Sequence, residues 1–404
     1  MSSSQTSSSG ILLVDKPKGV TSHDVVSCAR GLLHTKRVGH AGTLDPMATG
    51  LLILGFGNAT RLLNYLLGHD KTYEAVIRLG ESTNTDDADG DVVSSVDDEN
   101  SILNSANTDE ILKELRCVIA KNFTGHIMQT PTAFSAIKIN GVRAYDLARE
   151  GKDVHLEPRE VVIHDFSLLD ARFNVGVSGV KVVDVRASVS CSSGTYIRAL
   201  ARDLGRVLGV GGHLVSLRRT RIGEFSVEDD RVLKLETRIR TFADKNGVTQ
   251  TRAKAVVADR HDSVSNYFSD SVSNSVSNSS VACDLSGDSS CKKSAQKNYD
   301  LQNRVLSMFE SAKLTMQTVE ISENQAKDLR FGRKIVIPAI SEKNIIAYVK
   351  AEKDEQNDVV AVLETAEKSP ATAGGSRAFS KLQEKNEKNI NQIEAKPIVV
   401  FVQS

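Results

Sequence analysis

The sequence predicts an α+β fold, in which a mixed, largely antiparallel sheet is flanked by helices. Three observations favour this class. The stretch KTYEAVIRLG alternates with period two and places Tyr73 and Ile77 on one face, as a half-buried strand does. Asn140-Gly141 stands between two strand-like runs, which is a strong hairpin signal. In TSHDVVSCARGLLHT the apolar residues recur at helical spacing.

The first part of the chain supplies further elements in order. ILLVDKPKGV begins as a short apolar strand, and the helix that follows it has Ser22 as its expected N-cap. GLLILGFG is typical of a buried strand. NATRLLNYLLG indicates one helix closed by Gly68.

Later elements are predicted in the same way. The stretch 81–110 contains ten acidic residues and no Lys or Arg, and we expect a loop or an insertion. VKVVDVRASVSC is expected to be a strand, and GTYIRALARDLGRVLG a helix that ends at Gly209.

Composition divides the chain into segments. Twelve Ser between 262 and 290 and few large apolar residues indicate a segment that cannot offset the entropy of ordering. Short strand-like runs resume near Leu301. The expected segments are a disordered tail at 1–10, a globular domain at 11–230, a linker at 231–300 that is Ser-rich and disordered in 262–293, and a small β-rich domain at 301–404 with a polar insertion at 366–395.

Charge and cysteine usage exclude several classes of protein. The 404 residues include 51 basic and 51 acidic side chains, so that any polyanion partner must be attracted by a local patch. Between 198 and 221 there are six Arg and one acid. Five widely spaced Cys without a C-x-x-C pair argue against disulfides and against a metal site. The start MSSSQTSSSG is no secretory signal, and no apolar run is long enough for a membrane span, so we expect a cytoplasmic protein.

One carboxylate stands out in GHAGTLDPMATG. Asp45 precedes Pro46, and the ordinary interpretation is a helix N-cap. Glycines on both sides would let the backbone approach a ligand closely, which favours a functional turn. A nucleophilic carboxylate needs a cation that holds it ionised and oriented, and an adjacent Arg lowers an Asp pKa by roughly 1–3 units. Arg198, Arg202 and Arg206 recur at helical spacing, and this Arg-rich face could supply that cation, although we expect Arg206 itself to serve solubility at the surface.

Six segments in this order resemble the TruB family of tRNA pseudouridine synthases. They are DKPKGVTSHDVV, GHAGTLDPMATGLL, KTYEA, TPTAFSAIKINGVRAYDLAREG, CSSGTYIRALARDLG and HLVSLRRTRIGEF. The resemblance covers residues 11–226, and it departs from the family pattern at Thr132 and Phe134. A weaker resemblance, in VEISENQAKDLRFGRKI and KPIVVF, implies a C-terminal PUA-type RNA-binding domain.

The resemblance implies a function and a set of site residues. The function is isomerisation of uridine to pseudouridine in the T-loop of tRNA (uracil-55), with the T-arm of tRNA as partner, no metal and no organic cofactor. Asp45 would be the nucleophile and Arg198 its ion-pair partner. Tyr73 would pack on the target base and help to move a sugar proton. The implied substrate contacts are His40 to the RNA loop and Tyr196 and Leu217 in the uridine pocket.

Each assignment has an alternative. Tyr73 and Leu217 lie on apolar faces, where core packing is the usual role. A non-catalytic tRNA-binding or tRNA-folding module could use the same pocket. An aspartyl-phosphate phosphotransferase would want a second acid two residues after the first, where Met47 stands. No coiled-coil pattern or apolar patch appears, and we expect a monomer.

Overall fold

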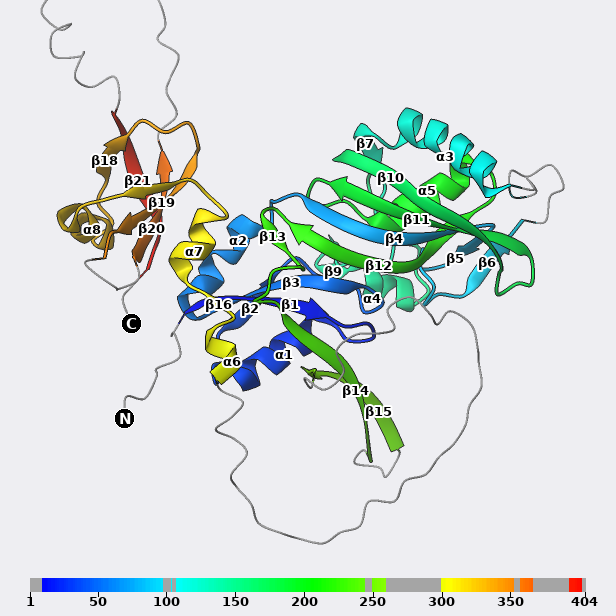
Figure 1. Ribbon diagram of the computed structural model, residues 1–404, viewed down its shortest axis with the longest axis horizontal. Helices are drawn as coiled ribbons and strands as arrows, with labels where there is room; N and C mark the ends of the chain where they lie inside the picture. Colours follow the sequence, from blue (N-terminus) through cyan, green and yellow to red (C-terminus); the bar gives the residue numbers. More distant parts are fainter. Residues whose placement is uncertain are drawn as a thin grey trace, which may run out of the picture.

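A twelve-stranded mixed sheet forms the body of the protein in the computed structural model, which describes residues 9–96, 103, 107–243, 249–258, 299–351, 357–365 and 392–401 (Figure 1). The central order is β15-β14-β1-β3-β12-β4-β11-β10-β7, with β13 on β12, β16 on β1 and β2 on β3. The β1–β14 and β3–β12 pairs are parallel and the other pairs are antiparallel. The predicted fold class is therefore confirmed.

The strands of this sheet are β1 (Gly10–Lys16), β2 (Val38–Ala41), β3 (Thr49–Phe56), β4 (Lys71–Leu79), β7 (Gly125–Gln129), β10 (Arg159–Val175), β11 (Lys181–Cys191), β12 (Gly212–Ile222), β13 (Phe225–Ser226), β14 (Leu233–Ala243), β15 (Thr249–Val257) and β16 (Val305–Leu306). Two small hairpins stand apart, β5 (Glu81–Thr83) with β6 (Val92–Ser95) and β8 (Lys138–Ile139) with β9 (Val142–Arg143).

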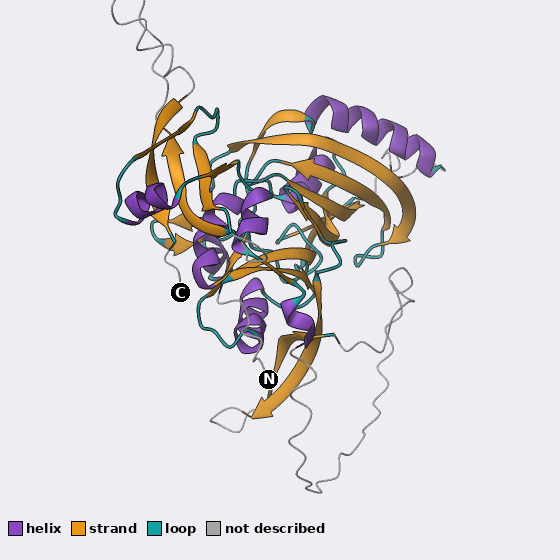
Figure 2. Cartoon of the chain, turned by 60° about the vertical axis from the view of Figure 1, so that its left-hand side comes forward, coloured by secondary structure: helices purple, strands orange, loops and turns teal. Residues whose placement is uncertain are grey.

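Three longer helices pack on the sheet (Figure 2). α3 (Thr108–Asn122) and α5 (Ile197–Val207) cover the half built on β4, β10, β11 and β12. α1 (Ser22–Leu32) covers the half that includes β1, β3, β14 and β15. The alternation predicted for β4 is confirmed, because Tyr73, Ala75, Ile77 and Leu79 are all buried.

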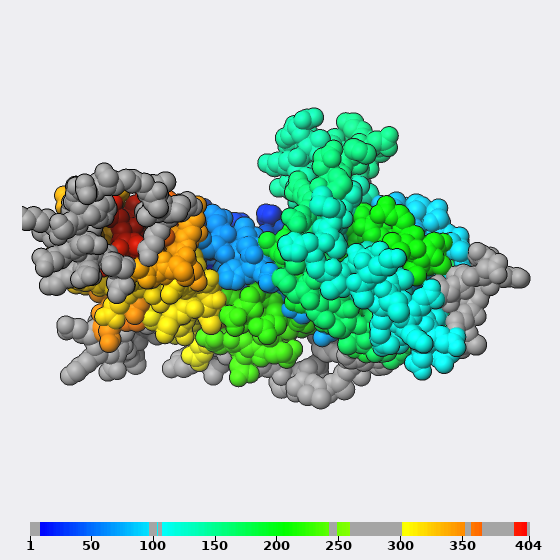
Figure 3. All heavy atoms as spheres, turned by 90° about the horizontal axis from the view of Figure 1, so that it is seen from above, coloured from blue at the N-terminus to red at the C-terminus, as the bar shows by residue number. Residues whose placement is uncertain are grey.

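A second, five-stranded sheet follows the body. Its order is β17 (Thr318–Glu320), β19 (Asn344–Val349), β20 (Asp358–Thr365), β21 (Gln392–Val400) and β18 (Ile335–Pro338), and α8 (Glu323–Arg330) packs on its own apolar core. α6 (Tyr299–Gln302) and α7 (Met308–Lys313) lead into it. In the space-filling view this C-terminal part lies against the body (Figure 3).

Two sequence expectations for local structure differ from the structure. The first helix is capped by Thr21, whose hydroxyl accepts a hydrogen bond from the Asp24 N–H while the Asp24 carboxylate accepts one from the Thr21 N–H. The helix expected to end at Gly68 is instead η1 (Gly57–Arg61) followed by α2 (Leu63–Leu66). The break arises because Leu62 packs toward the C-terminal sheet while Leu63 packs beneath β1 and β3.

Segment boundaries differ as well. Residues 233–243 and 249–257, expected to belong to a linker, form β14 and β15, because Leu233, Leu235 and Ala255 pack against α1. The acidic stretch 81–110, expected to be a loop, contains β5 and β6, and α3 begins at its end. The Ser-rich segment 262–293 and most of the insertion, 366–391, lie outside the described residues. Within the described residues, no helix has both the length and the apolar character needed to cross a membrane.

The predicted hairpin at 138–143 is confirmed, with positive φ at Asn140 (50°) and Gly141 (86°). It continues into α4 (Ala144–Arg149).

Candidate active site

Asp45 lies in the turn between β2 and β3, and several buried groups hold this turn. Ser22 Oγ donates to the Leu44 carbonyl (3.1 Å) and accepts from the Leu44 N–H (3.0 Å). Arg219, from β12, donates to the carbonyls of Gly42 (3.1 Å) and Leu51 (2.8 Å). On the other side the Gly19 N–H donates to the Pro46 carbonyl (2.8 Å). The carboxylate therefore stands on a fixed backbone, and it is not the N-cap of a helix.

Arg198 pairs with this carboxylate, as the resemblance implied. Arg198 Nε lies 3.0 Å from Asp45 Oδ2. The Arg198 side chain is only 6 % exposed, whereas that of Asp45 is 36 % exposed. The cation is thus internal and the carboxylate faces the surface, where a substrate can reach it.

Every part of the Arg198 guanidinium has a partner. Its Nη1 donates to the Thr85 carbonyl (3.0 Å) and lies 3.3 Å from Asp87 Oδ2, and its Nη2 donates to the Phe134 carbonyl (2.9 Å). Because a planar guanidinium held on three sides cannot turn, Asp45 meets it in one orientation. The contact to Phe134 is through its backbone, so the departure from the family pattern at that side chain does not affect it.

The pKa of the Asp45 carboxyl is raised above its ordinary value, mainly because the surrounding protein desolvates the group. The charge of Arg198 opposes this rise, and the nearby carboxylate of Asp87 adds to it. Arg198 lowers the pKa, as an adjacent Arg is expected to do, but its effect is smaller than that of desolvation. The net direction is upward because the cost of burying the carboxylate outweighs the pairing.

Tyr73 and Leu217 form an apolar wall beside Asp45. Both are buried and share one cluster with Leu44 and Met47 from the same turn. Burial raises the pKa of the Tyr73 hydroxyl, which interacts with the buried Arg219. Core packing, the alternative considered for both residues, is therefore part of their role, and Tyr73 also lies within electrostatic range of the Asp45 carboxylate.

Tyr196 precedes the first residue of α5 and is held by Gln129. The Gln129 side-chain amide donates to the Tyr196 carbonyl (3.1 Å) and accepts from its N–H (2.9 Å). Burial raises the pKa of the Tyr196 hydroxyl, which interacts with Ser135 and lies within electrostatic range of Asp45. Asp45, Arg198, Tyr73 and Tyr196 are thus brought together, and Leu217 lies in the same apolar cluster as Tyr73.

His40 lies on β2, on the approach to the Asp45 turn. Its ring packs edge-on against His23, with centroids 5.8 Å apart. Its pKa is lowered, mainly by burial and also by the neighbouring His23 and Arg219. Among the described residues, no hydrogen bond or ion pair joins His40 to the Asp45 carboxylate.

Sequence analysis missed two groups of functional neighbours. Arg219 is 1 % exposed and links Tyr73 to the Asp45 turn. In the sequence RRTR it looks like an ordinary charged surface residue. Asp86 and Asp87 come from the acidic stretch that had no assigned role, and they meet Arg202 (3.1 Å) and Arg198 (3.3 Å). In the sequence, two adjacent acidic residues and two Arg residues one helical turn apart form a pattern that could have predicted these ion pairs.

The Arg-rich segment 198–221 is largely internal rather than a surface patch. Arg198 and Arg219 are buried, Arg202 pairs with Asp86 and Asp203, and Arg218 binds Asp15 through two hydrogen bonds of 2.9 and 2.8 Å. Arg206, which we expected to serve solubility alone, is 73 % exposed and pairs with Asp203.

Lys16 has a structural role, because its ammonium group donates to the carbonyls of Pro17, Val20 and Pro46. Burial lowers the pKa of its ammonium group to about 8, against an opposing contribution from Asp45. In the described residues no cluster of three His, Cys, Asp or Glu side chains could hold a metal ion.

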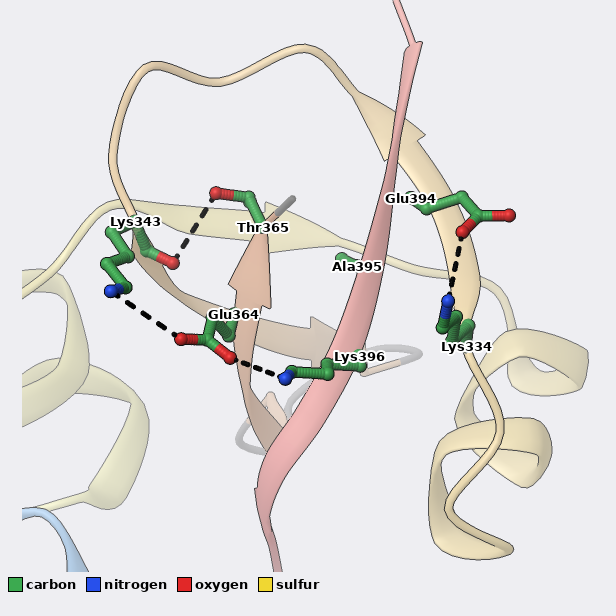
Figure 4. A pocket seen from close by; sticks show the side chains of 7 residues that line it. All are labelled: Lys334, Lys343, Glu364, Thr365, Glu394, Ala395 and Lys396. Carbon is green, nitrogen blue, oxygen red and sulfur yellow. Dashed lines mark hydrogen bonds and ion pairs between the residues drawn. The ribbon is translucent and has the colours of Figure 1, made fainter. Parts of the chain in front are cut away.

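A charged depression lies on the C-terminal sheet, away from Asp45 (Figure 4). Its charges largely pair with one another: Lys334 with Glu394 (3.3 Å), and Lys343 (3.7 Å) and Lys396 (2.8 Å) with Glu364. It contributes no group to the candidate active site.

Comparison with known proteins assigns a class to this arrangement. Residues 30–197 match the family described as "TruB family pseudouridylate synthase (N terminal domain)", and residues 198–255 match "tRNA pseudouridylate synthase B C-terminal domain". The two matches together contain Asp45, Tyr73 and Arg198. The protein is a pseudouridine synthase, an isomerase.

Named relatives match from about half to about nine tenths of the chain. A protein of Bifidobacterium longum (strain DJO10A) named tRNA pseudouridine synthase B is 42 % identical over 89 % of this chain and 96 % of its own length. One of Arthrobacter sp. (strain FB24) with the same name is 53 % identical over 56 % of this chain and 70 % of its own. The chain belongs to the TruB family.

A solved structure shares the fold. It is an H/ACA RNP bound to a substrate RNA containing 2′-deoxyuridine, with a TM-score of 0.55 and 22 % identity, covering 98 % of this chain and 85 % of that one.

Proposed function

We propose that this enzyme converts the uridine at position 55, in the T-loop of tRNA, into pseudouridine, with Asp45 as nucleophile. The observation that carries the proposal is the 3.0 Å ion pair between Asp45 and the internal Arg198, on a turn that lies within the family match. A tRNA substrate implies a cytoplasmic location. We also propose that the enzyme acts as a monomer, because Asp45 and its partners all come from one chain.

The reaction is an isomerisation, so atoms and charges must balance without a co-substrate. An Asp45 carboxylate oxygen attacks C1′, and the bond from C1′ to N1 of uracil breaks with its electron pair on the base. The freed base turns, C5 attacks C1′, and Asp45 leaves as a carboxylate. The C5 hydrogen is then lost as a proton and N1 gains one. A carboxylate suits this task because positive charge develops at C1′ when the bond to the base breaks.

The neighbouring residues have matching roles. Arg198 orients Asp45, and its positive charge favours the ionised form of the nucleophile against the effect of desolvation. The wall of Tyr73 and Leu217 suits a base that has left the RNA stack, because such a base is held by stacking on apolar and aromatic side chains. The Tyr73 phenol, with its raised pKa, stays protonated at neutral pH. We further propose that Tyr196 lines the same pocket and that His40 contacts the RNA loop.

The second candidate is a module that binds or folds tRNA without modifying it. The ion pair argues against it, because a binding surface for a polyanion gains nothing from a partly exposed carboxylate.

Asp45→Asn separates the two candidates. The substitution keeps size and removes the charge, and because Asp45 caps no helix the fold should survive. The variant should bind tRNA at least as tightly as the wild type but release no tritium from tRNA labelled at uridine C5, whereas the wild type releases tritium in proportion to the pseudouridine formed. Substantial tritium release by the Asn variant contradicts an aspartate nucleophile. A wild type that binds tRNA but forms no pseudouridine supports the second candidate.

A further inference from the structure

The β14–β15 ribbon has two unlike faces. It extends beyond the rest of the sheet beside α1 (Figures 1 and 2). One face carries Leu235, Ala253 and Ala255, which pack into the core shared with α1. Side chains alternate along each strand, so the residues between these point to the opposite face.

The opposite face is cationic. The register places Arg238 directly across from Lys254 and Arg240 directly across from Arg252. Like charges placed directly opposite destabilise a sheet, so four cations in two such pairs weaken the ribbon unless an anion binds them. Arg240, Arg252 and Lys254 line a depression on the ribbon.

The protein neutralises only part of this charge. Arg252 lies 3.3 Å from Asp24 and is 65 % exposed, and Arg238 lies 2.8 Å from Glu236. Across the described residues, neither Arg240 nor Lys254 takes part in an ion pair. This contrasts with the depression on the C-terminal sheet, where the lysines pair with glutamates.

The base of the ribbon adjoins the candidate active site. Thr237 Oγ1 donates to the Lys18 carbonyl (2.6 Å). Gly19, which follows Lys18, donates its N–H to the carbonyl of Pro46 (2.8 Å), the residue after Asp45. Two hydrogen bonds therefore connect the cationic ribbon to the turn that bears the nucleophile. In the Arg-rich segment 198–221, by contrast, most of the Arg side chains are buried or paired with carboxylates of the protein itself.

We propose that the cationic face of β14–β15 binds backbone phosphates of the substrate RNA outside the target loop, with Arg240 and Lys254 as the principal contacts. The inference rests on the proposed function, since a uridine held at Asp45 brings a polyanion next to the ribbon. Phosphate contacts position an RNA without reading its sequence. The contacts should therefore strengthen binding of all tRNA substrates alike.

The test compares two double variants of the full chain. Arg240→Gln with Lys254→Gln removes the two unpaired cations. Arg116→Gln with Lys121→Gln is the matched control, because it removes one exposed Arg and one exposed Lys from α3, which packs on β10 toward the far end of the sheet. Filter binding measures Kd for unmodified tRNA at several salt concentrations, on the Asp45→Asn background so that no turnover occurs. The same variants with Asp45 intact are assayed for pseudouridine formation, which gives kcat and KM.

The ribbon variant should bind tRNA several-fold more weakly at moderate salt. Its plot of log Kd against log salt should be shallower by about 1 to 2, because about one counterion is released for each phosphate contact. KM should rise and kcat should stay the same. The thermal midpoint without RNA should not fall, because a like-charge repulsion has been relieved. Arg240→Lys with Lys254→Arg should restore binding, since a phosphate contact needs the charge.

Three outcomes overturn the proposal: Kd and salt dependence equal to those of the α3 control, a fall in kcat with unchanged Kd, or unchanged tRNA binding together with weaker binding to phosphatidylserine vesicles, which would make the ribbon a membrane-binding surface. These results are distinguishable from failure of the proposed function. In that case the wild type forms no pseudouridine in tRNA, whatever the ribbon binds.

Discussion

At the scale of single residues, the ion pair of Asp45 with Arg198 depends on neighbours, Asp87 and Arg219 among them, that only the fold brings to it. A carboxylate between glycines and an Arg in a helical repeat are visible in the sequence because each is a local pattern. Arg219 was not visible, because adjacent Arg residues look alike in sequence and only the fold decides which one is buried. The same holds for Asp87, one of ten acids in its stretch.

Arg198→Lys should lower kcat by about 100-fold, the effect of misplacing a reacting group by about 1 Å. Lysine keeps the charge but cannot reach Asp45, Asp87 and the Thr85 and Phe134 carbonyls together. Arg206→Lys, at an exposed position on the same helix, should change kcat less than twofold. Steady-state rates of pseudouridine formation check both variants, and equal effects would remove Arg198 from the site.

The pH dependence of kcat/KM follows from the pKa of Asp45. The attacking form is the carboxylate, so activity should fall as pH drops through that pKa. Because burial raises the pKa, the acid limb should lie above the ordinary value for aspartate. Arg198→Gln removes the charge that opposes the rise and should move the acid limb of the residual activity to still higher pH. An acid limb that stays in place after this change would mean that another group sets it.

At the scale of elements, strands with a clean period were predictable and strands of mixed character were not. β4 alternates apolar and polar residues with one apolar face and was identified. In β14, LKLETRIRTFA also alternates between apolar and polar residues, but its second face carries Arg and Lys. The segment was therefore predicted to be part of a linker. The alternation of Leu233, Leu235 and Ile239 was the signal that could have identified it.

The close contact of β3 with β12 depends on Gly50. Its φ is +102°, and a Cβ there would lie 2.2 Å from the Arg219 carbonyl oxygen. Gly50→Ala should lower the free energy of unfolding by at least about 2 kcal/mol, from backbone strain and overpacking together. Activity should fall as well, because Arg219 holds the Asp45 turn.

Gly31→Ala is the control for this substitution. Gly31 is helical and exposed, with nothing within 4 Å of an added Cβ, so alanine should stabilise the protein by about 0.5–1 kcal/mol. Urea unfolding measures both variants. Similar stabilities for the two would mean that β3 can move away from β12 without cost.

At the scale of the whole molecule, the two sheets share an apolar cluster that joins residues far apart in sequence. Leu62 from the body packs with Ala312, Ile346, Val359 and Phe401. The Arg61 guanidinium also donates to the Val400 carbonyl (2.6 Å). β16 pairs with β1 before the second sheet begins, so the C-terminal part is tied to the body at two places. No local pattern in the sequence could reveal this coupling, because each segment looks like an ordinary apolar run.

Leu62→Ala tests whether this cluster makes the two sheets unfold as one. Leu62 is 2 % exposed, and its truncation should cost about 2–5 kcal/mol. Because the lost contacts lie between the sheets, the single calorimetric transition expected for the wild type should separate into two, with the C-terminal sheet melting first. Ile53→Ala removes a buried side chain of the body core instead, and should lower the midpoint while leaving one transition. Two transitions already present in the wild type would contradict the coupling, since the shared cluster would then be too weak to make either sheet depend on the other.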